Sequence, residues 1–156
     1  MSNNYYSTQE TAGIQAVYET GAFVETFSFA IPAVGFGVGD TVTLLKIPAY
    51  CALIDFAIDC PQLDSAGSPT VTIDLGDGGN SQRYIAAGAL GRSATDTVLT
   101  PSGIAGSAAG NWQQGALPHR YAAADNLVLK IHAAPTTPTV SGTITGHALF
   151  WGGQNQ

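Results

Sequence analysis

The stretch with the most chemically versatile side chains is "TVTIDLGDGGNSQRYIAAGALGRS", residues 70–93. Asp74, Asp77 and Asn80 supply the carboxylate and amide oxygens that Ca²⁺ prefers. Their three-residue spacing differs from that of an EF-hand loop, which alternates its ligands and closes on a distant glutamate. Residues 77–80, "DGGN", instead join two alternating runs and tolerate a positive φ. The same residue types serve a turn and a calcium site, and the sequence favours the turn.

The glycine-rich segments do not complete a nucleotide-binding motif. No Lys-Ser/Thr pair follows the glycines of residues 76–79, and no helix begins there to hold a phosphate. The run "GFGVGD", residues 35–40, precedes a predicted strand and lacks the dinucleotide-binding spacing. No G-x-S-x-G elbow is present, and no nucleophile can be grouped with a base and an orienting residue. We therefore predict no catalytic residue, no cofactor site and no enzymatic activity.

Three histidines, His119, His132 and His147, are the remaining candidate metal ligands. Residues 126–147 are predicted to form a hairpin with its loop near residues 135–138, because alternating runs flank two prolines. In that register His132 and His147 lie about five residue pairs apart, too far to share an ion at ~2 Å from each nitrogen. We therefore predict solvent-exposed or interface histidines and no metal site.

The two cysteines, Cys51 and Cys60, belong to one strand-like run, "YCALIDFAIDC". An unbroken strand at ~3.3 Å per residue would hold them roughly 30 Å apart, and their odd spacing places them on opposite faces. Disulfide geometry requires Cα atoms within about 7 Å. We expect two free thiols that are not bonded to each other.

Alternation with a period of two is the dominant pattern along the chain. It recurs in runs rich in Val, Ile, Thr and aromatic residues, which Gly or Pro separates. These runs are VETFSFAI, TVTLLKI, YCALIDFAIDC, TVTIDLG, NLVLKIHA and VSGTITGHALFW. In YCALIDFAIDC the pattern predicts one apolar face, formed by Tyr50, Ala52, Ile54, Phe56, Ile58 and Cys60. About seven to nine such strands predict an all-β fold, a single antiparallel β-sandwich that is jelly-roll-like.

The sandwich domain is expected to span residues 13–151, with three segments outside its predicted strands. Residues 1–12 are predicted to form an extended, polar N-terminal arm that carries tyrosines, and residues 152–156 a short polar C-terminal tail. Residues 88–119, rich in Gly, Ala and Ser, predict a long loop of the kind that is usually functional or disordered. A weak helical pattern occurs only around residues 11–20.

Charged residues make up 10% of the chain, against roughly 25% in ordinary globular domains. Low charge is typical of a protein that buries much surface against partners, although a weakly charged monomer has the same composition. The net charge is −6 and the Lys and Arg residues are scattered, so we expect no direct nucleic-acid or membrane partner. The chain shows no secretory signal and no run of ~20 apolar residues, which predicts synthesis and folding in a cytoplasm.

The candidate interface residues are large aromatic and basic side chains that lie outside the predicted strands. Aromatic residues in such segments often anchor contacts with partners. Loops that fold back onto the domain would bury the same side chains, so both interpretations stay open. The candidates are Tyr5, Tyr6, Trp112, His119, Arg120 and Trp151.

Three segments resemble a family of small tailed-phage virion proteins, which are β-sandwich proteins often encoded near the major capsid protein. The segments are GDTVTLLKIPAYCALIDFAIDC, TVTIDLGDGGNSQRYIAAG and YAAADNLVLKIHAAPTTPTVSGTITGHALF. The shared features are a strand ending in Lys-x-Pro-Ala, a strand running into Leu-Gly-Asp with Arg-Tyr-Ile, and a final hairpin after AADNLVL. The resemblance implies a capsid decoration or cement role, with the major capsid protein as partner, and supplies no catalytic residue.

Composition and resemblance together predict a non-enzymatic viral structural protein. It is expected to be a homotrimer that binds and stabilises the major capsid shell, located in the virion after assembly in the host cytoplasm. The alternative is a carbohydrate- or receptor-binding β-sandwich module of a phage tail or fibre, which Trp112 in a long loop favours. An enzyme ranks third, because no set of catalytic residues can be assembled from this sequence.

Overall fold

The computed structural model describes residues 2–7, 21–94, 96–99 and 117–152 of the chain. These residues form ten strands and no helix, so none of them belongs to a helix that could cross a membrane. The strands are β1 (Asn4–Tyr6), β2 (Gly21–Ala30), β3 (Thr41–Ile47), β4 (Cys51–Cys60), β5 (Thr72–Asp77), β6 (Ile85–Gly88), β7 (Asp96–Leu99), β8 (His119–Arg120), β9 (Asp125–Ala133) and β10 (Thr143–Gly152). The predicted all-β class is confirmed.

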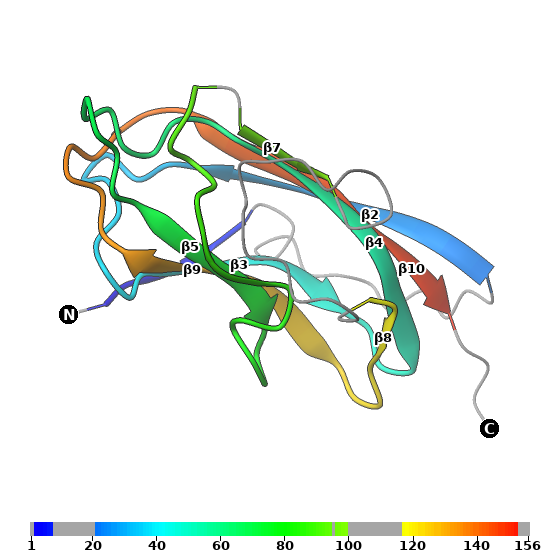
Figure 1. Cartoon of the computed structure of the whole chain (residues 1–156). Coiled ribbons are helices and arrows are strands. Elements are labelled where there is room, and N and C mark those ends of the chain that lie inside the picture. The colour runs from blue at the N-terminus through cyan, green and yellow to red at the C-terminus, as the bar shows by residue number, and fades with distance from the viewer. Residues whose placement is uncertain (1, 8–20, 95, 100–116, 153–156) are drawn as a thin grey trace.

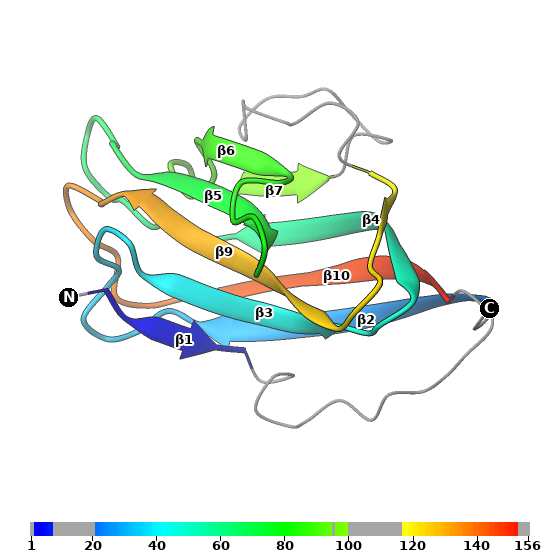
Figure 2. The same ribbon diagram turned by 90° about the horizontal axis from the view of Figure 1, so that it is seen from below.

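Two sheets pack face to face (Figure 1, Figure 2). Sheet A has the strand order β1-β3-β9-β5-β6, and sheet B has the order β2-β10-β4-β7, with β8 also paired to β4. The neighbouring strands are antiparallel, except that β1 runs parallel to β3 at the edge of sheet A. The predicted β-sandwich is therefore confirmed, while its jelly-roll connectivity stays a prediction.

The core lies between the sheets and follows from the alternation in each strand. On β9, Leu127, Leu129 and Ile131 are fully buried, whereas the intervening Lys130 and the following His132 keep contact with solvent. On β2, Phe27 and Phe29 are buried by the same rule. These side chains belong to one continuous hydrophobic cluster that both sheets share. The predicted inward faces of these two strands are confirmed.

Strand β4 breaks its alternation at a β-bulge. Leu149 of β10 lies opposite Asp55, but the next residue, Phe150, lies opposite Leu53. Ile54 is therefore an extra residue on β4, and it is 36% exposed. A single inserted residue shifts the two-residue period by one, so the residues before the bulge change faces.

The bulge corrects two predictions about this run. Tyr50 and Ile54 were expected on the core face, but both are exposed, and Leu53 is buried instead. Cys51 and Cys60 were expected on opposite faces, but both belong to the core cluster, because the bulge compensates for their odd spacing. They lie at opposite ends of β4 and are free thiols, as predicted.

The predicted hairpin over residues 126–147 was wrong. Strand β9 pairs with β3 and β5 in sheet A, whereas β10 pairs with β2 and β4 in sheet B. The connection of residues 134–142 carries the chain from one sheet to the other instead of closing a hairpin. Alternation identifies the buried face of each strand. Because every strand of the sandwich has a similar apolar face, alternation does not identify which strands pair with each other.

The segments assigned to the arm and the long loop contain short strands. Tyr5 and Tyr6 lie in β1, which extends sheet A, so their placement outside the strands was wrong. Strands β7 and β8 lie within or at the end of residues 88–119, and Trp151 lies in β10. The weak helical pattern at residues 11–20 falls outside the described residues. The division of the chain at residues 12 and 151 stays a prediction.

Three connections meet at one end of the sandwich, which we call the loop end. They are residues 31–40, 61–71 and 134–142, and they lie at the left in both views (Figure 1, Figure 2). Backbone hydrogen bonds join them: the amide of Thr139 donates to the carbonyl of Leu63 (3.0 Å). The loop end is therefore a continuous surface built from segments that are far apart in the sequence.

Candidate functional site

The stretch singled out for its chemistry forms the turn between β5 and β6, as predicted. The amide of Asp77 donates to the carbonyl of Asn80 (2.9 Å), and the amide of Asn80 donates back to the carbonyl of Asp77 (3.2 Å). A Cβ on Gly76 would lie 2.0 Å from the Asn80 carbonyl oxygen, and one on Gly78 would lie 2.4 Å from an Asp125 carboxylate oxygen. These two glycines are required for close packing, and no phosphate is needed to explain them.

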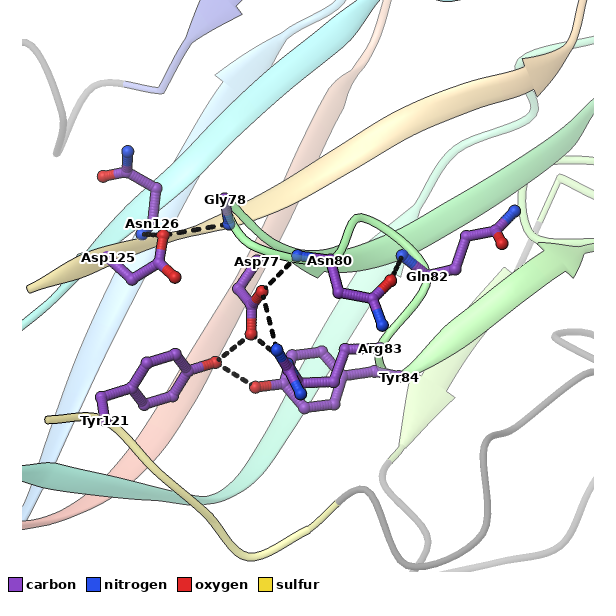
Figure 3. A network of polar contacts seen from close by, with 9 residues as sticks. All are labelled: Asp77, Gly78, Asn80, Gln82, Arg83, Tyr84, Tyr121, Asp125 and Asn126. Atoms are coloured by element: carbon purple, nitrogen blue, oxygen red, sulfur yellow. Dashed lines mark hydrogen bonds and ion pairs between the residues drawn. The ribbon is translucent and has the colours of Figure 1, made fainter. Parts of the chain in front are cut away.

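The Asp77 carboxylate is the centre of a buried polar network (Figure 3). It accepts hydrogen bonds from the Arg83 guanidinium, the Tyr121 hydroxyl (3.0 Å) and the amide of Asn80 (2.7 Å). The hydroxyls of Tyr84 and Tyr121 are also hydrogen-bonded to each other. Because Asp77 is 1% exposed, this pairing compensates for the loss of water around its charge.

The electrostatics of this network favour a structural role. Burial alone would raise the pKa of Asp77, but the bonds from Arg83, Asn80 and Tyr121 hold it below its usual range. Burial raises the pKa values of Tyr84 and Tyr121, so both remain neutral phenols. A general acid or base works best with a pKa near the operating pH, and this network moves its groups away from that range.

The network joins the two sheets at the end of the sandwich opposite the loop end. Tyr121 follows β8, and its amide donates to the carbonyl of Cys51 on β4 in sheet B (2.8 Å). Its side chain reaches Asp77 on β5 in sheet A. The ring of His119 packs edge-on against Tyr121, with ring centroids 4.7 Å apart. Burial, with a smaller effect of Arg83, lowers the pKa of His119.

Asp74, the other carboxylate of the stretch, has different partners from Asp77. The two lie three positions apart on β5, so they are on opposite faces of sheet A. Asp74 accepts from the amide of Ala87 (2.7 Å) and the side-chain amide of Gln82 (3.1 Å), and lies 3.1 Å from Nδ1 of His132. Within the described residues, no three His, Cys, Asp or Glu side chains are grouped to hold a metal ion. Asp74 and Asp77 therefore do not form a joint calcium site.

The structure places Arg120 and Trp151 on either side of Ala52 in sheet B, whereas Tyr6 lies on β1 at the edge of sheet A. Tyr6 and Trp151 are each 53% exposed, and Arg120 is also exposed on β8. His119 is half-buried against Tyr121. Trp112 falls outside the described residues. Their role at an interface stays a prediction.

Tyr5 holds β1 onto the sandwich. Its ring contacts Phe29 (5.8 Å between centroids) and Phe36 (5.7 Å), both of which are buried. Beside it, the amide of Ser7 donates to the carbonyl of Thr43 (2.9 Å), and the Ser7 hydroxyl donates to the carbonyl of Leu44. Tyr5 is therefore half-buried against the core, as the alternative interpretation of the aromatics allowed.

Sequence reasoning missed two buried carboxylates that order the loop end. Asp64 is fully buried and accepts hydrogen bonds from five backbone amides, those of Ala66, Thr70, Val71, Thr136 and Thr137. Burial alone would raise the pKa of Asp64, but these amides lower it far below its usual range. An Asp followed by Ser and Gly is a recognisable turn signal, but its long-range amide donors could not be identified before the fold was known.

Asp40 is the second of these carboxylates, and it orders the neighbouring connection. It is 1% exposed and accepts from the amide of Gly37 (2.8 Å) and the amide of Asn3 (2.6 Å). It therefore fixes both the turn before β3 and the chain that enters β1. A buried carboxylate therefore orders the C-terminal residues of the spaced-glycine run at residues 35–40.

No protein-family model matches the sequence, and no curated protein is detectably similar to it. Two solved structures have a similar fold. A chain from the capsid of Ralstonia phage GP4 superposes with a TM-score of 0.73 at 17% identity, over 97% of this chain and 99% of that chain. A chain from the capsid asymmetric unit of cyanophage Pam1 superposes with a TM-score of 0.63 at 15% identity, over 89% of this chain and 90% of that one. At these identities the likeness establishes the fold.

Proposed function

We propose that this protein is a non-enzymatic structural protein of a bacteriophage virion that binds the major capsid protein and stabilises the shell. The observation that carries this proposal is the fold shared over almost the whole chain with proteins found in two phage capsids. Because one fold can host many functions, the likeness alone does not assign the role, and the surface must agree with it. The site of action would be the virion, with assembly in the host cytoplasm.

The order of the strands supports a jelly roll, a fold that recurs in viral capsid proteins. If β1 and β8 are set aside, eight strands remain, in the orders β3-β9-β5-β6 and β2-β10-β4-β7. Most successive strands alternate between the two sheets, as in two interlocked Greek keys. This arrangement leaves the connections at the two ends of the sandwich free to contact neighbours.

The surface also supports a decoration or cement role. Only 10% of the residues are charged, and burying a weakly charged surface costs less desolvation than burying lysines and glutamates. Several large apolar side chains are exposed, among them Val34 at 80% and Trp151 at 53%. Such a surface favours association with other subunits, and we propose a homotrimer as the attached form.

The test is binding to empty shells assembled from the major capsid protein. The purified protein should sediment with the shells at a fixed ratio and raise the temperature at which they disassemble. Light scattering of the free protein should give its oligomeric state independently. A protein that stays in the supernatant at all concentrations and leaves shell stability unchanged would contradict the proposal.

A carbohydrate- or receptor-binding module is the second candidate, and the exposure of Trp151 favours it. An indole on a flat sheet face can stack on a sugar ring. A glycan array separates the two functions: specific binding that is lost in Trp151→Ala, without binding to shells, would support the module. Binding to shells that Trp151→Ala leaves intact would support the decoration role.

A further inference from the structure

We infer that the loop end is the surface that contacts the capsid shell, and that it meets an uncharged, apolar region of the major capsid protein. This inference rests on the proposed function and adds which face of the sandwich is used. In this orientation the strands run outward from the shell surface. The opposite end of the sandwich, with the Tyr84–Tyr121 network, points away from the shell.

The first observation is a group of exposed valines. Val34 is 80% exposed, Val38 is 62% exposed and Val140 is 52% exposed. The first two lie in the connection of residues 31–40, and Val140 lies in that of residues 134–142. Together these side chains give the loop end apolar surface that burial against a partner would remove from water.

The second observation is the charge distribution. The three connections of the loop end contain only two charged side chains, Asp40 and Asp64, and both are buried. Their oxygens accept backbone amides of the same connections, so neither charge is presented to a partner. Arg92 lies beside the loop end, where its guanidinium donates to the carbonyl of Val71 (2.7 Å).

The third observation is the rigidity of these loops. The five amides that donate hydrogen bonds to Asp64 belong to two different connections. The Asp64 carboxylate therefore joins residues 61–71 to residues 134–142. Gly35, at a φ of 70°, packs so closely that a Cβ there would lie 2.6 Å from the Cβ of Pro138. The exposed valines therefore stand on loops that are already ordered. A surface ordered in advance loses little conformational entropy on binding.

The exposed valines, the lack of exposed charge and the ordered loops together define the chemistry of the partner's surface. An uncharged, ordered surface with exposed valines gains from burial against apolar side chains. A partner that presented unpaired charges to these connections would lose their hydration without compensation, because the connections themselves carry no exposed charge. The matching region of the shell protein is therefore uncharged and largely apolar.

A second group of exposed apolar residues fits this description less well. Val24, Ile54 and Trp151 lie on the outer face of sheet B, towards the far end of the strands. Charged residues lie within the same strands, since Glu25 follows Val24 and Asp55 follows Ile54, whereas the loop-end connections contain no exposed charge. This surface serves as the internal control for the experiment.

The experiment introduces a single charge at each exposed valine and measures binding to shells. Val34→Asp, Val38→Asp and Val140→Asp place a carboxylate on the loop end, and Val24→Asp is the matched control. Val24 lies six residues before the end of β2, about 20 Å from the loop end at ~3.3 Å per residue. Melting temperatures confirm that each variant is folded before its binding is compared.

We expect each loop-end variant to bind shells on the order of tenfold more weakly, and Val24→Asp to bind as the unmodified protein does. The inference fails if Val24→Asp weakens binding and the loop-end variants do not. It also fails if the loop-end variants change only the oligomeric state of the free protein, which would assign this surface to contacts between copies. If the unmodified protein does not bind shells at all, the proposed function fails first, and this inference fails with it.

Discussion

At the scale of single residues, buried carboxylates order the turns and connections of this protein. Asp77 fixes the turn between β5 and β6 through Arg83, and it links this turn to sheet B through Tyr121. Asp64 gathers five backbone amides from two connections that lie about 70 positions apart in the sequence. Hydrogen bonds to a charged group are stronger than those between neutral groups, so one carboxylate can replace a small hydrophobic cluster in ordering a loop.

Replacing Asp64 with Asn should destabilise the protein strongly. The amide side chain has a single acceptor oxygen and no charge, so some of the five buried amides would lose their partner. We expect the free energy of unfolding to fall by roughly 2–4 kcal/mol. Denaturant unfolding of Asp64→Asn measures this loss, and Ser141→Ala, at an exposed position of the loop end, should change stability by less than about 0.5 kcal/mol. Equal effects of the two substitutions would contradict the role assigned to Asp64.

Stability should also fall in acid, for the same reason. The pKa values of Asp64 and Asp77 are lower in the folded state than the value of about 3.9 expected in the unfolded chain. Their stabilising contribution is therefore complete above that unfolded value and is lost as the pH falls towards the folded values. The melting temperature should fall most steeply below about pH 4, after a smaller decline below about pH 6.5, because the pKa of His119 is also lower in the folded state than in the unfolded chain.

The variant Asp64→Asn tests whether Asp64 causes part of this loss of stability in acid. Because it lacks one of the two shifted carboxylates, its melting temperature should decline less steeply below about pH 4. Identical slopes in the variant and the unmodified protein would show that other groups cause the acid effect.

At the scale of elements, β1 is the least expected strand, because residues 1–12 were predicted to lie outside the sandwich. Its three residues are too few to be stable alone, and no hairpin joins it to β3. Side chains hold it instead: the Tyr5 ring packs against both Phe29 and Phe36, which also stack on each other. Tyr5 therefore packs this edge strand onto the core, beside the hydrogen bonds of Asn3 and Ser7.

Replacing Tyr5 with Ala should detach β1 and expose some of the core. Truncation of a fully buried aromatic residue costs about 3–5 kcal/mol, and since Tyr5 is half-buried we expect a loss of about 2 kcal/mol. The neighbouring Tyr6 is 53% exposed, so Tyr6→Ala should change stability by less than about 0.5 kcal/mol. Thermal or denaturant unfolding compares the two variants. If Tyr5→Ala is as stable as Tyr6→Ala, β1 does not contribute to the fold.

At the scale of the whole molecule, charges are scarce and those at the loop end are buried. The chain has five Lys and Arg and eleven Asp and Glu residues, and its net charge of −6 does not favour an acidic partner. Apolar side chains at the loop end and on sheet B are exposed instead. A molecule with this surface associates through desolvation of apolar groups and not through long-range attraction.

Attachment to shells should therefore depend little on salt. Ionic screening weakens contacts between exposed charges, and the loop end presents none from its own connections. Between about 0.05 and 0.5 M NaCl the affinity for shells should change by less than about threefold. Sedimentation at several salt concentrations measures this. A steep loss of binding with added salt would assign the contact to charged residues elsewhere on the protein.

Several features were determined by the sequence itself. Alternating runs and their Gly or Pro boundaries predicted an all-β sandwich, the turn at residues 77–80 and two free cysteines. These predictions succeeded because they depend on local properties: which side chains one strand can bury, and which residues accept a tight turn.

Only the tertiary structure decided which strands are neighbours and which polar residues matter. The split of β9 and β10 between two sheets, the bulge at Ile54 and the amides gathered by Asp64 each join segments that are distant in the sequence. A strand that buries one face can pair with any similar strand, and one extra residue reverses its faces. The pairing and register of the strands depend on the packing of the whole core. The reason is that the free energy of each pairing includes contacts with side chains of the other sheet.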